Sequence, residues 1–281
     1  MKKDNNNLSD NTAQAVTSKD VYIIKTDSTI DRKPDSIAVE QVVTVMIDKV
    51  GSFTILCSPS DLKALAVGFV FAEGMIDSTD DILDITLKQD MPNVVGVQIH
   101  DPSRITIERN MIVASSCGMC GSRNIEKLLN DVPQVENSLK LSAKQLMKIT
   151  ENMLSRQKIF HNTGGSHAAC IFDAEGRITS FAEDIGRHNA LDKAVGKCLL
   201  NGISMKSSGA ALSGRASLEM VSKAARAGLE LIAAVSAPSS LAVETAQKWN
   251  ITLCGFVRPE RLNVYTHRER IKDSDTEGNQ T

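Results

Sequence analysis

The chain has 281 residues, of which 42% are hydrophobic and 23% charged, a composition typical of a globular protein with one large domain or two modest ones. Its formal net charge of −2 argues against a protein that binds duplex nucleic acid, because such proteins usually carry a clear basic excess. No apolar run reaches the roughly 20 residues that span a bilayer, and no apolar segment follows the lysines at residues 2–3 as it would in a signal peptide. We therefore expect a cytoplasmic protein with no nucleic-acid or membrane partner.

Residues 1–35 are rich in Asn, Asp, Ser, Thr and Lys, and we expect them to be mostly disordered apart from a short strand near residues 21–24. Residues 36–112 alternate between short apolar runs and turns, which predicts a small α+β subdomain. Its predicted elements are paired strands at 42–47 and 53–57, a helix capped by Ser60 or Asp61 that stops near Gly74, and strands around 85–87 and 94–99.

Residues 113–140 hold the most unusual motif of the chain, the sequence Cys117-Gly118-Met119-Cys120-Gly121, followed by a helix-forming run. Small residues around two thiols predict a mobile loop that presents sulfur rather than burying it. The start of a helix stabilises a nearby thiolate, which makes it nucleophilic near neutral pH. The other cysteines lie among apolar neighbours, and in a reducing compartment we expect them to be small buried residues: Cys57, Cys170, Cys198 and Cys254.

Residues 141–270 predict a layered α/β domain with a parallel or mixed sheet, and residues 271–281 predict a disordered tail. Ser142 and Gln145 form a capping box at the start of a helix, and a hairpin then joins two strands. From there helices alternate with short apolar strands. The hairpin strands are expected at 168–172 and 177–181, the helices near 190–200, 218–227 and 241–249, and the later strands at 209–212, 229–235 and 251–257.

Polar loops follow four of these strands, at residues 183–189, 213–217, 236–240 and 258–261. Ligands of open α/β sheets bind at the carboxyl ends of the strands beside helix N-termini, so four such loops on one edge predict a binding site. Arginines suit phosphate, and loops rich in serine and glycine offer backbone N–H groups, so we expect a phosphorylated or dinucleotide ligand. The candidate residues are Arg187, His188, Ser213, Arg215, Arg258 and Arg261.

The alternative for each arginine is solvation or an ion pair with Asp184, Glu219 or Glu260. At the start of a helix His188 is disfavoured as a cation, so it fits a neutral donor or acceptor role. A second glycine-rich loop precedes the hairpin. In that loop Gly165 and His167 either contact a ligand or belong to a capped turn.

Four chemistries compete for the paired cysteines. Structural zinc needs a second cysteine pair or a histidine pair, and a thioredoxin-like dithiol needs a strand-to-helix junction; the chain fits both poorly. Zinc-dependent nucleoside deaminases share the layered order, but their histidine comes before the cysteine pair, whereas here Cys117 precedes His167. The fourth is sulfur carriage, in which a thiol takes sulfur from a donor and hands it to an acceptor in the neighbouring pocket.

Taken together, several motifs resemble the FdhD family of formate dehydrogenase accessory sulfurtransferases. The match runs in the same order along the chain from about residue 42 to about residue 267. The motifs are residues 117–121 (CGMCG), 164–169 (GGSHAA), 183–193 (EDIGRHNALDK), 213–217 (SGRAS), 255–258 (GFVR) and 264–266 (VYT).

The resemblance implies a fold similar to that of cytidine deaminases, a homodimer, and a cytoplasmic factor that matures molybdenum or tungsten formate dehydrogenases. It also implies that sulfur arrives as a persulfide from a cysteine desulfurase. The sulfur then passes to the metal of bis-molybdopterin guanine dinucleotide, which such proteins bind before the cofactor enters the apoenzyme.

Carried to this chain, the resemblance implies that Cys117 holds the persulfide and that Cys120 assists, relays or resolves it. It also implies that one stretch contacts the guanine dinucleotide: Phe256, Val257, Arg258, Pro259, Glu260 and Arg261. The roles of His167, Arg187 and Arg215 rest mainly on the argument that ligands bind at the strand ends, and no metal site of the protein's own is expected. The alternative function is a non-catalytic chaperone that holds the cofactor for the apoenzyme, with the cysteines secondary.

Overall fold

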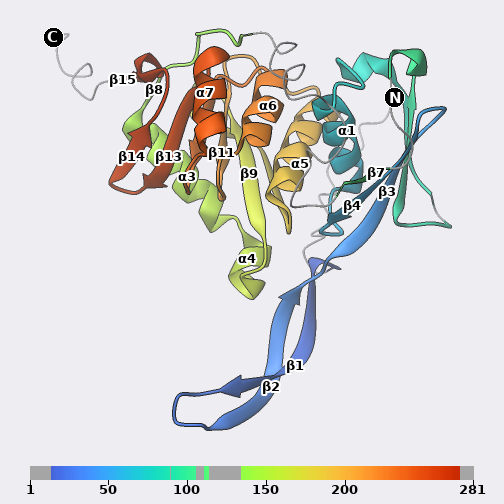
Figure 1. Cartoon of the computed structure of the whole chain (residues 1–281), viewed down its shortest axis with the longest axis vertical. Coiled ribbons are helices and arrows are strands. Elements are labelled where there is room, and N and C mark those ends of the chain that lie inside the picture. Colours follow the sequence, from blue (N-terminus) through green and yellow to red (C-terminus); the bar gives the residue numbers. More distant parts are fainter. Residues whose placement is uncertain (1–13, 89, 106–110, 114–133, 273–281) are drawn as a thin grey trace, which may run out of the picture.

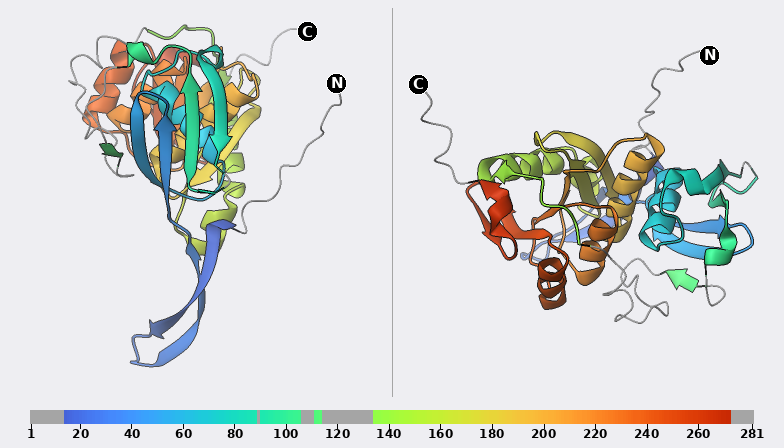
Figure 2. Two further views of the ribbon diagram at one scale, coloured as in Figure 1. Left: turned by 90° about the vertical axis from the view of Figure 1, so that its right-hand side faces the viewer. Right: turned by 90° about the horizontal axis from the view of Figure 1, so that it is seen from above.

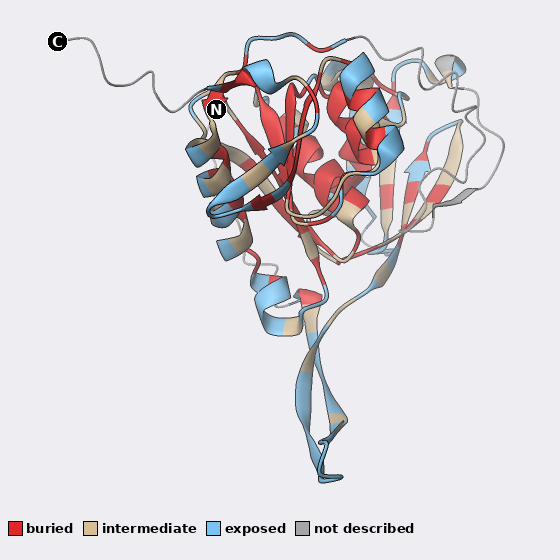
Figure 3. Cartoon of the chain, turned by 60° about the vertical axis from the view of Figure 1, so that its left-hand side comes forward, coloured by how far each residue is buried: buried red, intermediate tan, exposed pale blue. Residues whose placement is uncertain are grey.

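The computed structural model describes residues 14–88, 90–105, 111–113 and 134–272, and Figure 1 shows how they are arranged. The protein is a mixed α/β structure with a six-stranded sheet, a five-stranded sheet and a two-stranded hairpin that projects from the body. A single cluster of buried apolar side chains continues from the smaller sheet through the helices to one face of the larger sheet (Figure 3). No helix in these residue ranges is long and apolar enough to cross a membrane.

The larger sheet is mixed rather than wholly parallel. Its strands are β9 (His167–Phe172), β10 (Ile178–Asp184), β11 (Gly209–Leu212), β12 (Leu231–Ala234), β13 (Thr252–Arg258) and β14 (Arg261–Val264), in the order β10-β9-β11-β12-β13-β14. Strands β11, β12 and β13 are parallel, as predicted. The predicted β9–β10 hairpin is also confirmed, and β9 is antiparallel to β11 as well. Strand β14 pairs antiparallel with β13 and was not predicted.

Helices cover both faces of this sheet (Figure 2). One face packs against α5 (Arg187–Leu200), α6 (Leu218–Arg226) and α7 (Ser240–Lys248), and the other packs against α3 (Ala143–Ser155). Strands such as β11 and β12 are buried on both faces, which explains their continuous runs of Ala, Leu and Ile. Helix α3 begins at the predicted capping box, in which the Ser142 hydroxyl accepts from the Gln145 N–H and the Gln145 side chain accepts from the Ser142 N–H.

Several short elements join these layers. Helix α4 (Lys158–Thr163) lies between α3 and β9 and was not predicted. Strand β15 (Ile271–Lys272) pairs in parallel with β8 (Leu141–Ser142), so the first two residues of the tail predicted as disordered are ordered, and the rest of that tail lies outside the described residues. The 3₁₀ turns span Thr79–Asp81, Pro102–Arg104 and Arg268–Arg270.

The smaller sheet packs one face on helix α1 (Leu62–Ala72). Its strands are β3 (Gln41–Ile47), β4 (Gly51–Cys57), β5 (Ile82–Leu87), β6 (Val94–Ile99) and β7 (Met111–Val113), in the order β5-β6-β3-β4-β7. The predicted pairing of β3 with β4 is confirmed. Asp61 stands at the N-cap of α1 but makes no capping hydrogen bond, because its carboxylate instead pairs with Lys197 of α5 at 2.6 Å.

The N-terminal segment differs from the prediction. Strands β1 (Val16–Ile24) and β2 (Ile30–Ala38) form an antiparallel hairpin, where we expected disorder through residue 35 with one short strand. The average composition of this segment is polar, but its β-branched and aromatic residues gather beside one turn, where a hairpin can use them. We call residues Val16–Ala38 the arm; it projects from the body beside α4 (Figure 1).

Two glycines let the helices of the two sheets approach closely. A Cβ atom at Gly68 of α1 would overlap the carbonyl oxygen of Asp192, and one at Gly196 of α5 would overlap the carbonyl oxygen of Ala64. Backbone atoms cannot move aside as the end of a flexible side chain can. The junction between the two sheets therefore requires glycine at both positions.

We predict that Gly196→Ala lowers the free energy of unfolding by about 1–3 kcal/mol, because the added methyl group overpacks this junction. Helix propensity alone predicts the opposite sign, a gain of about 1 kcal/mol. Urea denaturation measures the difference. Gly96→Ala is the control, because its methyl group would lie 3.1 Å from the Thr86 hydroxyl oxygen and 3.9 Å from the Thr86 carbonyl oxygen, so it should cost less stability than Gly196→Ala. A Gly196→Ala variant as stable as the parent would contradict the close approach of α1 and α5.

Candidate functional site

The four polar loops predicted to form a site do lie on one edge of the larger sheet. Strands β10 and β11 are both antiparallel to β9 and so run in the same direction, which β12 and β13 share. Their carboxyl ends therefore meet at one edge, which we call the strand-end edge. Backbone bonds join neighbouring loops there, since the N–H of Ser236 donates to Gly214 and the N–H of Phe256 donates to Ser236.

His167, Ser213 and Arg187 come together at this edge from three different elements. The Ser213 hydroxyl accepts from the Ala168 N–H at 2.8 Å and lies 3.5 Å from His167 Nδ1. A Cβ atom built on Gly214 would lie 3.4 Å from His167 Nδ1 and 3.6 Å from the Arg187 side chain. Gly214 is therefore close to both side chains. Burial lowers the pKa of His167, and the nearby Arg187 lowers it further, so the imidazole is neutral at pH 7.

Two helices begin at the strand-end edge. Helix α5 begins after Gly186, which has no side chain to cap it, and α6 begins after Ser217, whose hydroxyl makes no capping bond. The Ser217 hydroxyl and Arg187 Nε are both buried without a hydrogen-bond partner among the residues that the structure describes. Helix N-termini carry partial positive charge and free N–H groups. Together with the Arg187 guanidinium, they make a site for an anion.

His188 belongs to a buried charged cluster behind this edge rather than to its surface. Its Nε2 lies 3.2 Å from the Glu219 carboxylate, and one turn further along the same two helices Lys223 pairs with Asp192 at 2.7 Å. Burial raises the pKa of Glu219. Burial lowers the pKa of Lys223, but the carboxylates of Asp192, Glu73 and Glu219 outweigh it and raise the pKa overall. Glu219 therefore pairs with His188, and the positive charges of Lys223 and Arg187 act against the effect of its burial.

The stretch from Phe256 to Arg261 forms the turn between β13 and β14, and its residues face different ways. The Val257 side chain is buried in the core beside α3, so only its backbone is available to a ligand. The Arg258 guanidinium donates to the carbonyl of Val235 at 2.6 Å and thereby ties the ends of β12 and β13 together. Phe256, Glu260 and Arg261 are exposed, as is Arg215 in the neighbouring loop.

Glu183 shapes the loop that contains Gly165 and was missed by the sequence analysis. Its carboxylate accepts from the N–H groups of Ile159 and Phe160 at the start of α4 and from the Ser166 hydroxyl at 2.7 Å. A single buried carboxylate thus fixes both α4 and the loop that leads to His167. The sequence showed Glu183 only as part of a polar loop, without the partners that give it this role.

Cys117 and Cys120 lie outside the described residues. The strand before them, β7, ends at Val113, which pairs with Ile55 of the parallel strand β4. The four cysteines within the described residues are buried, as predicted. Burial raises the pKa to about 12 for Cys57, Cys170 and Cys254 and to about 11 for Cys198, so these thiols are protonated and unreactive near neutral pH.

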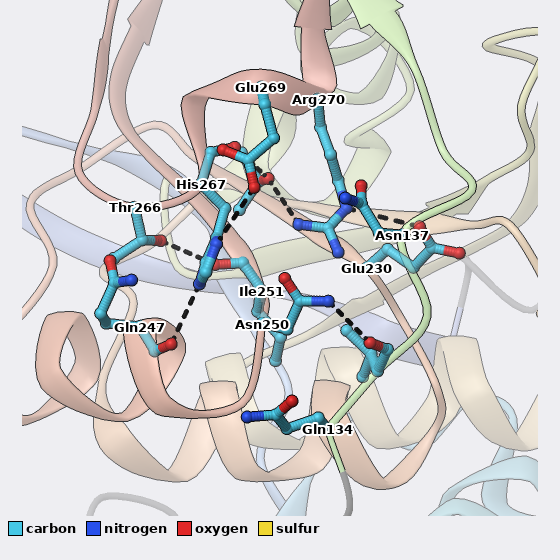
Figure 4. Close-up of polar contacts among 12 residues, drawn as sticks. Gln134, Asn137, Glu230, Gln247, Asn250, Ile251, Thr266, His267, Glu269 and Arg270 are labelled. Carbon is cyan, nitrogen blue, oxygen red and sulfur yellow. Dashed lines mark hydrogen bonds and ion pairs between the residues drawn. The ribbon is translucent and has the colours of Figure 1, made fainter.

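The opposite edge of the larger sheet carries a second polar cluster and a cavity. Glu230 accepts from the N–H groups of Ser138 and Leu139. It also lies 3.4 Å from Arg270, its neighbour in Figure 4, and Arg270 donates to the carbonyl of Glu136. These groups bond to each other and hold the start of the domain against its end. The cavity beside them measures about 570 Å³ and is bounded by the carboxyl ends of α5 and α6. In the described part of the chain, no group of three or more His, Cys, Asp or Glu side chains is placed to hold a metal ion.

Comparison with known proteins gives consistent matches along the chain. The profile of the FdhD/NarQ family matches residues 38–272. A protein named sulfur carrier protein FdhD from Picrophilus torridus is 38% identical over 249 residues, 86% of this chain and 94% of the relative. One of the same name from Streptomyces avermitilis is 34% identical, over 91% of this chain and 96% of the relative. A crystal structure of a formate dehydrogenase accessory protein from Desulfotalea psychrophila matches with a TM-score of 0.75 and 25% identity, over 92% of this chain and all of that one.

We predict that Arg187→Gln raises the pKa of His167 toward the ordinary histidine value of about 6.5, because the substitution removes a neighbouring positive charge while burial is unchanged. The pKa is read from an NMR titration of the ring protons, and the chain has only 5 histidines to assign. Arg215→Gln is the matched control, since Arg215 is exposed and should leave the pKa of His167 unchanged. Equal shifts in the two variants would contradict the described geometry.

Proposed function

The chain belongs to the FdhD/NarQ family, and we infer from this membership that it is a sulfur carrier protein that serves formate dehydrogenase. We propose further that it acts as a sulfurtransferase, taking persulfide sulfur from a cysteine desulfurase and passing it to the metal of bis-molybdopterin guanine dinucleotide. The observation that carries the proposal is the anion site at the strand-end edge, where Arg187 and two uncapped helix N-termini converge.

The loading step is a thiol exchange that needs no external oxidant. The Cys117 thiolate attacks the outer sulfur of the desulfurase persulfide, the sulfur–sulfur bond of the donor breaks, and the donor leaves as a thiolate. A new sulfur–sulfur bond on Cys117 holds the transferred atom, and Cys120 assists or resolves it. The four buried cysteines have raised pKa values and cannot offer a thiolate, which leaves Cys117 and Cys120. The family resemblance assigns the persulfide to Cys117.

The cofactor is cargo in this proposal, and its diphosphates match the strand-end edge. Arg187 and the N–H groups at the starts of α5 and α6 supply donors to phosphate, with the Ser217 hydroxyl free to join them. Arg215 and Arg261 add exposed positive charge at the rim. Neutral His167 adds a hydrogen-bonding group without adding charge. Glu260 opposes an anion at one side, which favours phosphate binding nearer to Arg187 than to the turn between β13 and β14.

Strand β7 is directed toward the strand-end edge. Strand β7 runs parallel to β4, and β4 leads directly to Ser58, whose N–H donates to Asp184 at the end of β10. Val113, the last residue of β7, precedes Cys117 by four residues. Strand β7 itself thus runs toward the side of the molecule that carries the anion site. We place the reaction in the cytoplasm, with the desulfurase and the formate dehydrogenase apoenzyme as partners.

A non-catalytic chaperone is the second candidate function. The rigid, described part of the site consists of groups that bind an anion, and such a site would also serve a protein that only holds the cofactor and docks the apoenzyme. The two candidates differ in what they require of the cysteines. A carrier needs a thiolate at Cys117, whereas a chaperone needs only the arginines.

We predict that Cys117→Ala abolishes formate dehydrogenase activity in a cell that depends on this protein, and that mass spectrometry after incubation with a cysteine desulfurase and cysteine shows added sulfur on Cys117 of the parent. Cys254→Ala is the control. Its thiol is buried with a raised pKa and should accept no sulfur from the desulfurase, so its loss should preserve activity.

The chaperone hypothesis predicts a different pattern of activities among the variants. Cys117→Ala and Cys120→Ala would then both keep activity, while Arg258→Ala would lose it. Full activity of Cys117→Ala would therefore rule out the sulfurtransferase in favour of the second candidate.

A further inference from the structure

A side-chain contact joins helices α5 and α6 directly behind the anion site. His188 is the second residue of α5 and Glu219 is the second residue of α6, and His188 Nε2 lies 3.2 Å from the Glu219 carboxylate. Both residues belong to the first helical turns, whose free N–H groups lie at the strand-end edge. We call these two side chains the cross-helix pair. A change of charge at the two helix starts is therefore also a change in the surroundings of this pair.

The cross-helix pair is largely withdrawn from water. The His188 side chain is 7% exposed and the Glu219 side chain is 18% exposed. The pair has a formal charge of −1 when the imidazole is neutral and the carboxylate ionised, and of 0 when the two groups share one more proton. In a place so poor in water, nearby charges decide between these two states.

Charges on the inner side of the pair do little to keep Glu219 ionised. Burial raises the pKa of Glu219 most; Lys223 lowers it, whereas the carboxylates of Asp192 and Glu73 raise it further. Lys223 and Asp192 pair with each other at 2.7 Å, so their charges largely cancel. Glu73 stands at the end of α1. Asp184, at the end of β10, is likewise neutralised by its lysine partner at 2.6 Å.

The positive groups on the outer side are those of the anion site itself. Arg187 precedes His188 in α5 and lowers the pKa of Glu219. The partial positive charge at the starts of α5 and α6 acts in the same sense, because it favours an ionised carboxylate and disfavours a protonated imidazole. His167, which also lies beside Arg187, is neutral and adds no charge. The groups that bind a phosphate are therefore the same groups that stabilise the ionised form of Glu219.

We propose that an anion bound at the strand-end edge causes the cross-helix pair to take up a proton. The bound anion offsets the charge of Arg187 and of the two helix starts, so Glu219 loses the positive charge that favoured its ionised form. The pair then takes a proton from water, and its charge changes from −1 to 0. The part of the Glu219 side chain that remains exposed lets this proton arrive from solvent.

Such a coupling is reciprocal, because the proton and the anion each raise the affinity of the protein for the other. The anion-bound protein holds more protons, so the affinity for the anion falls as the pH rises through the range in which the pair titrates. His188 and Glu219 are positioning residues in this scheme, since neither contacts the anion.

The inference rests on the anion site of the proposed function and adds a property to it. A carrier must bind its cargo and later give it up to the apoenzyme. When the cargo leaves, Glu219 ionises again and replaces part of the negative charge that Arg187 and the helix starts lose. The resident carboxylate thereby makes release of the cargo easier.

The test measures the binding of guanosine diphosphate mannose by isothermal titration calorimetry. Both ends of its diphosphate are esterified, as in the proposed cargo, so the charge of the ligand stays constant near neutral pH. For the parent, the dissociation constant should rise roughly threefold or more between about pH 6 and about pH 8, because binding consumes a proton. At pH 7 the apparent binding enthalpy should vary with the ionisation enthalpy of the buffer in the sense of proton uptake.

Glu219→Gln keeps the size of the side chain but cannot ionise. It should bind the ligand more tightly than the parent at pH 8, because no resident carboxylate competes with the anion for Arg187, and its dissociation constant should no longer depend on pH. Glu244→Gln removes an exposed carboxylate from α7 and is the matched control, which should keep the pH dependence of the parent.

Proton uptake by the parent together with tighter, pH-independent binding by Glu219→Gln would support the coupling. A parent that binds without proton uptake would overturn it while leaving the anion site intact. So would a Glu219→Gln variant that keeps the pH dependence of the parent, since another group such as His167 would then take the proton. Weaker binding by Glu219→Gln at pH 8 would also overturn it, because the pair would then only brace the helices. A parent that does not bind the ligand would overturn the anion site and the coupling together.

Discussion

The rest of the structure depends on the buried carboxylate of Asp184. It accepts from the N–H of Ser58 at the end of β4, from the N–H of Gly186 before α5, and from the Asn189 side chain, and it pairs with Lys193 at 2.6 Å. Asp184 and Lys193 are fully buried. A charge removed from water in this way is stable only when its partners are complete, and breaking such a pair costs about 3–5 kcal/mol. One side chain thus joins the smaller sheet, the larger sheet and the first turn of α5.

That junction determines what the strand-end edge can bind. Because the Asp184 oxygens accept from Gly186 and pair with Lys193, Asp184 does not pair with Arg187, three residues further on. The Arg187 side chain instead faces the loop that contains Gly214. Glu183 turns the other way and holds α4, beside which the arm leaves the body. Two adjacent acidic residues therefore fix three neighbouring features: the anion site, the loop leading to His167, and the base of the arm. The close packing of Gly68 and Gly196 keeps α1 and α5 in the arrangement that this junction needs.

Local signals predicted much of this structure, and contacts between distant residues account for what they missed. The capping box at Ser142 and the apolar runs of β11 to β13 involve neighbours in sequence, so pattern and propensity identified them. The order of strands also placed His167, Arg187 and Ser213 on one edge. By contrast, the role of Glu183 depends on α4, 23 or more residues away, and that of Asp184 depends on Ser58, 126 residues away. The arm was missed because its strands have a polar average composition. The Val257 side chain faces the core because burial alternates at this end of β13, where Phe256 and Arg258 on either side are exposed.

The central claim is that the anion site lies at the strand-end edge and not in the cavity at the opposite edge. Hydrogen–deuterium exchange with and without guanosine diphosphate, a fragment of the proposed cargo, tests it most directly. The account predicts that bound nucleotide slows exchange in residues 185–190 and 214–219, at the starts of α5 and α6, with little change elsewhere. Slowing confined to residues 198–207 and 225–230, which line the opposite cavity, or no slowing at nucleotide concentrations in the millimolar range, would contradict it.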